Sequence, residues 1–361
     1  MTSTFAKNGD LYYTNLSKRF KTYYSPNING KYPKFQEAEI EFGGHAFISP
    51  SQDYLIVDAR NREDKNQKAD LYVCFKKKDG AWTKPINLGI TVNSKFDEKS
   101  ANVTPDGKYL ISAGTGRVIK RWDIKTSELV NTYRAHKSPI HSLAYADNGQ
   151  WIASAGDDKK IHIWNADKNT LINSLEGHKD SILSVKFSPD GKFLVSTGRD
   201  KTIILWDWQE GLQVKRFYGH QKSINSIDFS TDGRQLITAS DDKTIRLWDI
   251  GEGKEVRKFE GHKEKAIVAR FSPNNQFILS GSADQTLRLW GAKSANQIYS
   301  FKGLASLANS VDFSADGHYV LSAHNDRTIK LWDMRNGQNI KVFRRHKGRV
   351  NSVSFSSGGN L

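Results

Sequence analysis

The chain has 361 residues, with 54 Lys and Arg against 39 Asp and Glu, which gives a formal net charge of +15. It is 37% hydrophobic and 26% charged, as in soluble globular proteins, and no stretch approaches the roughly 20 apolar residues of a membrane span, so no membrane partner is expected. The single cysteine, Cys74, excludes a disulfide framework and a multi-cysteine metal site. Because it lies in an apolar strand-like run, we expect a buried thiol and not a nucleophile.

The N-terminus shows no targeting segment. Residues 1–10 contain neither a basic segment followed by an apolar run nor a small-residue cleavage site, so a signal peptide is not supported. The sequence therefore favours a cytoplasmic protein. An extracytoplasmic location is the alternative if a signal peptide has been removed.

Residues 1–98 alternate strand-like runs with turn clusters. The segment 48–55, Ile-Ser-Pro-Ser-Gln-Asp-Tyr-Leu, parallels the segment 103–110, Val-Thr-Pro-Asp-Gly-Lys-Tyr-Leu. This pattern resembles the TolB-type, or PD40, propeller repeat over residues 1–110. The resemblance implies two blades within residues 1–98, and many members of that family are extracytoplasmic, in contrast to the missing signal peptide.

From residue 99 the chain repeats with a fixed period of 42 residues, which is the strongest signal in the sequence. A tryptophan returns without a slip, and a histidine and an aspartate return with one exception each. The tryptophans are Trp122, Trp164, Trp206, Trp248, Trp290 and Trp332. The histidines are His136, His178, His220, His262 and His346, with Leu304 at the missing place, and the aspartates are Asp158, Asp200, Asp242, Asp284 and Asp326, with Gly116 at the first place.

Each repeat reads as four short β-strands. In one unit the expected strands are residues 182–187, 193–197, 202–206 and 212–217, separated by turn clusters such as Ser-Pro-Asp-Gly. No segment has a helical period long enough to cover a sheet, so each sheet must bury its faces against its neighbours. Only a stack closed into a ring does this without exposed ends, and the sequence therefore predicts a β-propeller.

The repeated unit, with its Gly-His, Ser-Pro-Asp-Gly, Asp-Lys-Thr-Ile and Leu-Trp-Asp elements, closely resembles the WD40 repeat over residues 99–361. The resemblance implies that the His, a strand Ser or Thr, the turn Asp and the strand Trp of each blade form a hydrogen-bonded network. Such a chain gives a buried indole N–H, a hydroxyl and an imidazole the partners they need. The implied networks are His178, Ser196, Asp200 and Trp206; His220, Thr238, Asp242 and Trp248; and His262, Ser280, Asp284 and Trp290. Blades that depart from the pattern, at Gly116, Asn165, Gly291 and Leu304, are expected to depend more on apolar packing.

The predicted fold is an all-β, single closed propeller of eight four-stranded blades, with seven as the alternative. Residues 1–98 supply two TolB-like blades, residues 99–346 supply six WD40-type blades, and residues 347–361 supply a closing strand. We expect this closing strand to complete the N-terminal blade as its innermost strand and to displace residues 2–6, because an unpaired strand is an aggregation hazard. The alternative is a chain whose next blade is missing.

Catalysis is not expected. Ser, His and Asp recur with every blade, whereas a catalytic triad appears once. The sequence has no Gly-x-Ser-x-Gly elbow, no phosphate-binding loop before a helix, no His-Glu-x-x-His and no paired cysteines. We therefore predict no catalytic residue, no cofactor and no bound metal.

The basic excess indicates where a partner would bind. Residues 1–98 hold 15 basic and 12 acidic residues, or +3, which leaves 39 against 27, or +12, for residues 99–361. In WD40-like rings one face carries the turns between the second and third strands and the loops between blades, and most residues at these places are basic. The candidate rim consists of Lys137, Lys159, Lys179, Arg199, Lys201, Asp241, Lys243, Lys263, Asn325 and Arg327. A positive rim would attract an acidic peptide, a phosphoprotein or a nucleic acid. The alternative is that Asp-Lys-Thr is simply favourable turn chemistry and that the lysines keep the surface soluble.

Two functions remain. The favoured one is a monomeric, non-catalytic scaffold that binds proteins, possibly acidic ones, through the loop face and the channel mouth. The other is a basic propeller that binds nucleic acid, in which case its affinity would fall steeply with salt. The aromatic series occupies core positions, which counts against stacking of single-stranded bases on the rim.

Overall fold

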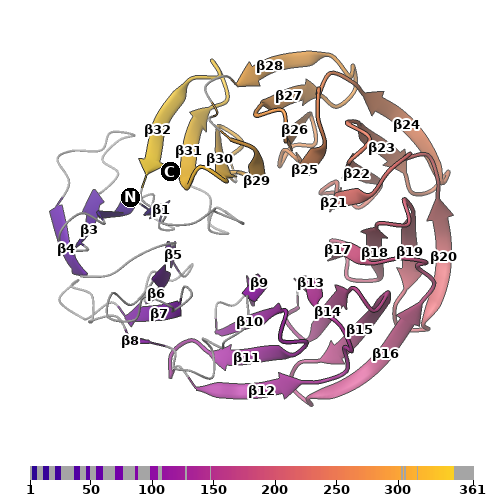
Figure 1. The fold of residues 1–361 in the computed structure, drawn as a ribbon, viewed down its shortest axis with the longest axis horizontal. Helices are drawn as coiled ribbons and strands as arrows, with labels where there is room; N and C mark the ends of the chain where they lie inside the picture. The colour runs from indigo at the N-terminus through magenta and orange to yellow at the C-terminus, as the bar shows by residue number, and fades with distance from the viewer. Residues whose placement is uncertain are drawn as a thin grey trace.

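The computed structural model describes the strands of residues 1–103 and, with their side chains, residues 104, 108–126, 128–146, 148–301, 304, 306–314 and 316–342. The described elements are all β-strands, and no helix that could span a membrane is found among these residues. Figure 1 shows the strands grouped in sheets around a central axis. The fold class predicted from the sequence, all-β with four-stranded units, is confirmed for the repeat region.

Six four-stranded antiparallel sheets follow one another from β9 to β32, and in each the strands pair in chain order. The first two are β9 (Glu98–Val103), β10 (Tyr109–Gly114), β11 (Ile119–Asp123) and β12 (Leu129–Tyr133), then β13 (Ile140–Tyr145), β14 (Trp151–Gly156), β15 (Lys160–Asn165) and β16 (Thr170–Glu176). The next two are β17 (Ile182–Phe187), β18 (Phe193–Gly198), β19 (Ile203–Asp207) and β20 (Leu212–Phe217), then β21 (Ile224–Phe229), β22 (Gln235–Ser240), β23 (Ile245–Asp249) and β24 (Lys254–Phe259). The last two are β25 (Ala266–Phe271), β26 (Phe277–Ser282), β27 (Leu287–Gly291) and β28 (Gln297–Phe301), then β29 (Ala308–Phe313), β30 (Tyr319–His324), β31 (Thr328–Asp333) and β32 (Asn339–Arg344).

The first eight strands pair in two further four-stranded sheets. They are β1 (Thr2–Phe5), β2 (Leu11–Asn15), β3 (Lys21–Ser25) and β4 (Gln36–Ile40), then β5 (Ala46–Ile48), β6 (Tyr54–Ala59), β7 (Asp70–Phe75) and β8 (Ile86–Asn87). β1 pairs with β2 from Thr2↔Thr14 to Phe5↔Leu11, so it holds the edge position that the sequence analysis gave to the C-terminal strand. The expected displacement of residues 2–6 is therefore wrong, because residues 2–40 already supply four strands. The closing strand itself, within residues 347–361, lies outside the described residues.

The strands begin and end close to where the residue pattern places them. β17 and β20 have the expected bounds, whereas β18 extends one residue further and β19 begins one residue later. Each repeat therefore folds as a meander, because turn clusters separate runs of β-branched and aromatic residues. Two turns of each sheet lie at one end of its strands, and the turn between the second and third strands lies at the other.

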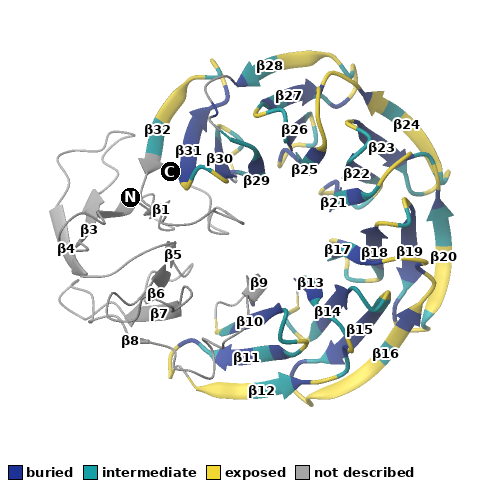
Figure 2. Ribbon diagram, in the orientation of Figure 1, coloured by how far each residue is buried: buried dark blue, intermediate teal, exposed yellow. Residues whose placement is uncertain are grey.

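Burial explains why the sheets stack around an axis. In the described sheets of the repeat region the second and third strands are buried on both faces, as in β18, whereas the fourth strand is exposed over its first residues and buried near its end, as in β20 (Figure 2). A strand can be buried on both faces only if a neighbouring sheet covers each face. The first strands lie nearest the central axis and the fourth strands lie on the outside (Figure 1).

The apolar core lies between consecutive sheets. One buried cluster joins Ala153, Ile161 and Ile163 of the sheet β13–β16 to Ile182 and Val185 of the next sheet. Other clusters repeat this arrangement across the next sheet boundaries. Each sheet thus removes apolar surface of its neighbour from water, which stabilises the fold by about 25 cal/mol per Å² of apolar surface buried. None of these interfaces exists in an isolated repeat.

Candidate functional site

Each repeat carries a buried polar network that links its strands. In the sheet β17–β20, His178 Nδ1 lies 2.8 Å from Asp200 Oδ2 and His178 Nε2 lies 2.7 Å from Ser196 Oγ. Trp206 Nε1 donates to the same hydroxyl at 2.8 Å. The network joins the loop before β17 to β18, to β19 and to the turn between them, so it fixes one end of the sheet.

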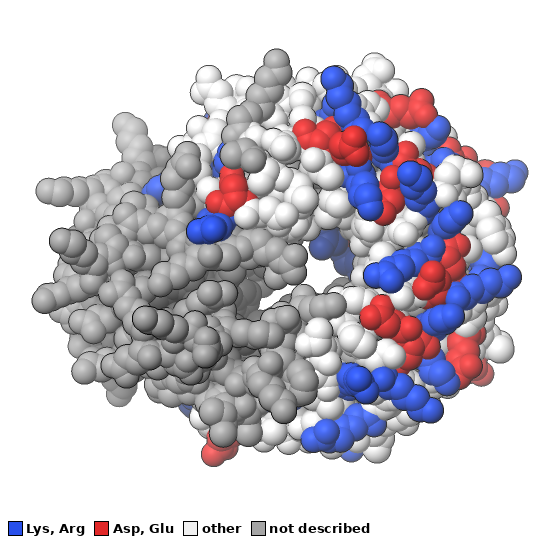
Figure 3. Space-filling model, viewed as in Figure 1, with Lys and Arg blue, Asp and Glu red and all other residues white. Residues whose placement is uncertain are grey.

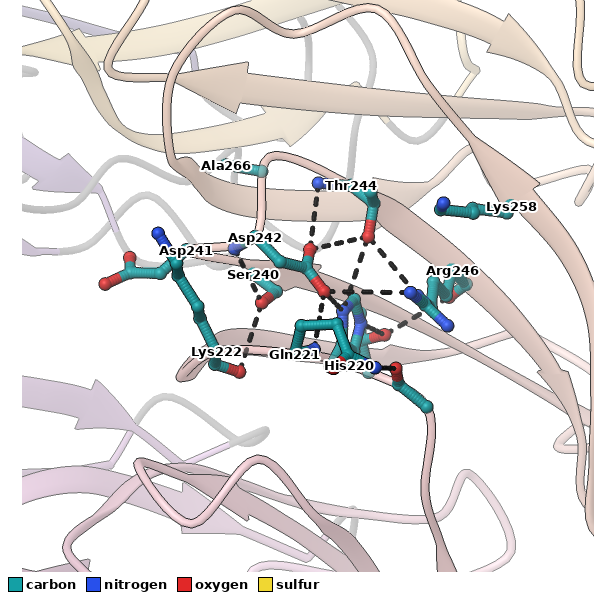
Figure 4. A network of polar contacts seen from close by, with 12 residues as sticks. His220, Gln221, Lys222, Ser240, Asp241, Asp242, Thr244, Arg246, Lys258 and Ala266 are labelled. Carbon is teal, nitrogen blue, oxygen red and sulfur yellow. Dashed lines mark hydrogen bonds and ion pairs between the residues drawn. The ribbon is translucent and has the colours of Figure 1, made fainter.

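The same geometry returns in the next two sheets. His220 bridges Asp242 and Thr238 at 2.8 Å each, and Trp248 donates to Thr238 at 2.9 Å. Figure 4 shows Asp242 facing both His220 and Thr244, whose hydroxyl donates to Asp242 Oδ1 at 2.6 Å. The corresponding group in the sheet β25–β28 is His262, with Asp284 at 2.9 Å and Ser280 at 2.8 Å, and Trp290, which donates to Ser280 at 2.8 Å.

The aspartates of these networks are ionised at neutral pH. Burial alone would raise the pKa of Asp200, but hydrogen bonds from His178, the Lys179 backbone N–H and Thr202 outweigh it and lower that pKa to about 2. The pKa values of Asp242 and Asp284 are lowered for the same reasons. Burial lowers the pKa values of His220 and His262, although the neighbouring carboxylates act in the opposite direction.

A fourth network was not among the three sets expected from the sequence. His136 contacts Asp158 and Ser154 at 2.8 Å each, and Trp164 donates to Ser154 at 3.1 Å. The 42-residue register contains all four residues, so the signal that would have found this network is present. Asn165, which replaces the Asp after Trp164, does not disturb it.

The sheet β29–β32 replaces the missing histidine in a different way. Leu304 is buried in the core cluster of that sheet, in agreement with the expected apolar packing. A histidine from the second strand, His324, contacts Ser322 Oγ at 2.7 Å, and Trp332 donates to the same hydroxyl at 2.8 Å. A second histidine position therefore supplies the contact that Leu304 cannot make.

The sheet β9–β12 lacks the network among its described residues. Ser112 and Trp122 occupy the positions of Ser196 and Trp206, but Ser112 Oγ and Trp122 Nε1 are buried without a hydrogen-bond partner. Gly116 stands where the other repeats have the turn aspartate. The strands that carry Ser112 and Trp122, β10 and β11, still form, so among the described residues this sheet depends on packing where the other sheets have the network.

The Ser-His-Asp groups are not accessible to a substrate. Ser196 is fully buried, and its hydroxyl contacts both His178 and Trp206. A serine nucleophile must reach the carbonyl carbon that it attacks, which this position does not allow. These groups therefore stabilise the sheets. Among the described residues, His136, Asp158 and His162 are the group whose ligand atoms lie close enough together, within 4.8 Å of one another, to hold a metal ion.

The rim residues lie on one end of the sheets, at the turns between second and third strands and at the loops that precede the first strands. Asp241 is half-buried and the other nine residues of the candidate rim are exposed. Three of its lysines have backbones in the left-handed region, with φ of 65° at Lys159, 67° at Lys201 and 74° at Lys243. Glycine and asparagine adopt this conformation at lower cost, so turn geometry alone does not call for lysine there.

Part of the rim is neutralised by ion pairs. Lys265 pairs with Asp241 at 2.7 Å, and Lys243 pairs with Glu264 at 3.7 Å. Lys243 Nζ also donates to the carbonyl of Lys263 at 2.6 Å, so the turn of one sheet lies beside the loop that begins the next. The rim of the sheets β21–β24 and β25–β28 is therefore less positive than its sequence indicates.

The rest of the rim keeps its charge. Five exposed basic residues on the sheets β13–β16 and β17–β20 form no ion pair within the described part of the chain, and we call them the basic arc: Lys137, Lys159, Lys179, Arg199 and Lys201. The nearby Asp157 is paired with His141 at 2.6 Å, which leaves Asp180 as an exposed carboxylate beside the arc. Figure 3 shows one face of the molecule, where Lys and Arg are interleaved with Asp and Glu over the sheets between β13 and β24.

Comparison with known families agrees with this architecture. Residues 127–165 and 169–207 match the model of the WD domain, G-beta repeat, and residues 200–361 match the model of the IFT122 first beta-propeller. No curated protein matches the chain. No family model supports the TolB-type resemblance of residues 1–110, which stays a prediction. The chain therefore contains WD40 repeats, and its residues 200–361 are similar to a β-propeller domain.

Proposed function

We propose that the protein is a non-catalytic scaffold that binds an acidic protein segment through the basic arc. WD40 repeats and propeller domains of this kind suggest protein interaction; residues 127–165 and 169–207 match the repeat and residues 200–361 match a propeller domain. The observation that carries the proposal is the set of exposed basic side chains that form no ion pair with another described residue, two of them on turns where the backbone favours another residue type. Unpaired charge on one face costs little in water and acts at a distance on a partner of opposite sign.

The geometry favours a peptide or a protein loop over nucleic acid. The arc extends over two neighbouring sheets, and Asp180 and the Asp157–His141 pair lie among its cations. A phosphate backbone needs a continuous run of cations, whereas an acidic segment with a few carboxylates can contact separate cations. The exposed large apolar residues lie mainly on the fourth strands, such as Leu171 and Leu212, and so on the outer wall and not on the rim.

The scaffold proposal includes the form of the whole molecule. We infer one ring of eight blades, two from residues 1–98 and six from residues 99–346, in which residues 347–361 pair with the N-terminal part. In this proposal the protein is a cytoplasmic monomer, and the ring offers its loop face and channel mouth to partners. The six described sheets of the repeat region support it, since each of them needs a neighbour on both faces.

A matched pair of double variants tests the arc. Lys159→Asn with Lys201→Asn removes two arc charges, and asparagine tolerates the left-handed backbone of both turns. Lys168→Asn with Lys192→Asn removes the same charge from the opposite end of the same two sheets, where both lysines are exposed. The probes are a fluorescent Glu-rich peptide and a generic RNA of the same charge, each titrated at low and high salt.

We expect the arc variant to bind the peptide about tenfold more weakly, because each lost contact contributes roughly 0.5–1 kcal/mol, while the control variant binds as the wild type does. Equal losses of peptide affinity in both variants would show that only net charge matters and would rule out the basic arc as the binding site. Tighter binding of the RNA than of the peptide, with a steep salt dependence, would favour the nucleic-acid alternative.

A further inference from the structure

His162 is a buried histidine without a polar partner among the described residues. It lies on β15 with 5% of its surface exposed, and neither ring nitrogen has a hydrogen-bond partner in that part of the chain. Its ring packs edge-on against that of His136, with the centroids 4.5 Å apart. Because buried polar groups nearly always have a partner, two unsatisfied nitrogens on one ring indicate that a water molecule or an ion belongs there.

The repeats show what usually occupies this position. At the same register, 42 residues apart, the chain has Arg246 and Arg288, and each guanidinium lies 3.8 Å from the turn aspartate of its own network, Asp242 or Asp284. A positive charge thus faces the network carboxylate in those two sheets. The sheet β17–β20 has the apolar Ile204 instead.

In the sheet β13–β16 the carboxylate of Asp158 faces no such cation from this position. Lys160, the next cation along the strand, is held in an ion pair by Glu176. The imidazoles of His162 and His136 and the carboxylate of Asp158 therefore meet at one point.

We propose that His136, Asp158 and His162 bind a divalent transition-metal ion, and Zn²⁺ is the ion that best suits this set of ligands. Two imidazole nitrogens and one carboxylate oxygen form a common three-residue set for zinc, with water at the fourth position. The three ligand atoms lie within 4.8 Å of one another. Ligand atoms at about 2.1 Å from one tetrahedral ion are about 3.4 Å apart, so the most widely separated pair must approach by up to about 1.4 Å when the ion binds.

The network around the site can adapt to the ion. Bound to the ion through Nδ1, which faces Asp158, the neutral His136 ring would carry its single proton on Nε2, where Ser154 Oγ lies 2.8 Å away. Ser154 can accept that N–H together with the indole N–H of Trp164, while its own proton points to the carbonyl of His162 at 3.4 Å. A ligand histidine whose second nitrogen is hydrogen-bonded in this way is held in a fixed orientation.

Two substitutions taken from the other repeats test the site without disturbing the fold. His162→Ile introduces the residue found at Ile204, and His162→Arg introduces the residue found at Arg246. Both positions are equivalent to His162 in other four-stranded sheets of the chain. His318→Ala removes an exposed histidine on another sheet and serves as the control. Binding of Co²⁺ is followed by its visible absorption, and binding of Zn²⁺ by calorimetry and by the shift in melting temperature.

The wild type and the His318→Ala variant are expected to bind one ion with the absorption of a low-coordinate Co²⁺ site and to melt at a higher temperature with Zn²⁺. Both His162 variants should lose that absorption and bind Zn²⁺ at least tenfold more weakly. Unchanged affinity in His162→Ile would overturn the proposal, and so would wild-type binding weaker than a Kd of about 100 µM. A wild-type chain that binds no metal would assign a buried water to His162 instead.

Discussion

The hydroxyl at the centre of each network provides a sharp test of the energetics. Ser196→Ala removes the group that both Trp206 Nε1 and His178 Nε2 contact, at 2.8 Å and 2.7 Å. Both nitrogens stay buried, and each unsatisfied buried group costs about 1–2 kcal/mol. We therefore expect the substitution to lower the free energy of unfolding by about 2–4 kcal/mol, measured from the urea midpoint at constant slope.

The chain supplies its own control for this experiment. Ser112 occupies the same place in the sheet β9–β12 and is equally buried, but its hydroxyl has no partner among the described residues. Ser112→Ala leaves no new group unsatisfied, so we expect a change within about 0.5 kcal/mol or a slight gain in stability. Equal losses for the two variants would mean that side-chain volume, and not the network, determines the cost, and would refute the reasoning.

Three other perturbations test separate parts of the structure. Asp228 is buried between the cations of Lys186 and Arg270, which lie on the first strands of the two neighbouring sheets, with Arg270 Nη1 at 3.3 Å. Asp228→Asn should therefore lower the free energy of unfolding in urea by about 2 kcal/mol. An unchanged free energy would show that these charges do not link the sheets. Burial lowers the pKa of His324 to about 4, so the unfolded chain binds protons that the folded chain excludes. The contribution of His324 to stability should therefore be complete above about pH 6.5 and fall by about 1.4 kcal/mol per unit toward pH 4. The two preceding sheets carry Ser240 and Ser282 at this position, so a His324→Ser variant should show a shallower decline in stability between pH 7 and 5. Lys201→Gly relieves a φ of 67° and should stabilise the fold by about 0.5–1 kcal/mol, and destabilisation in thermal melts would contradict the strain at that turn.

Much of the fold can be read from the sequence because the repeat is so regular. The period of 42 residues assigns the same role to Trp206, Trp248 and Trp290, and the strands begin and end within a residue of the turn clusters. Regular spacing also brings the His, Ser or Thr, Asp and Trp of one repeat into one network, since equivalent residues occupy equivalent places. What the register could not indicate is a substitute from outside the pattern, such as His324, which acts in place of the missing histidine at Leu304.

The charge of the rim and the metal group could not be read in the same way. Both depend on which side chains approach one another across sheets, as with Lys265 and Asp241, or on the absence of a partner, as with His162. A sequence motif records the residue at a position but not the residue that faces it in three dimensions. The expected displacement of residues 2–6 was wrong for a related reason, because four N-terminal strands complete their own sheet.

The claim on which the rest depends is that successive sheets cover one another around a closed ring. An experimental density map of the full chain measures this directly. The account predicts eight blades around one axis, with residues 350–355 paired to the N-terminal part of the chain. A map with an open end, two separate lobes or helices packed over a sheet would contradict it.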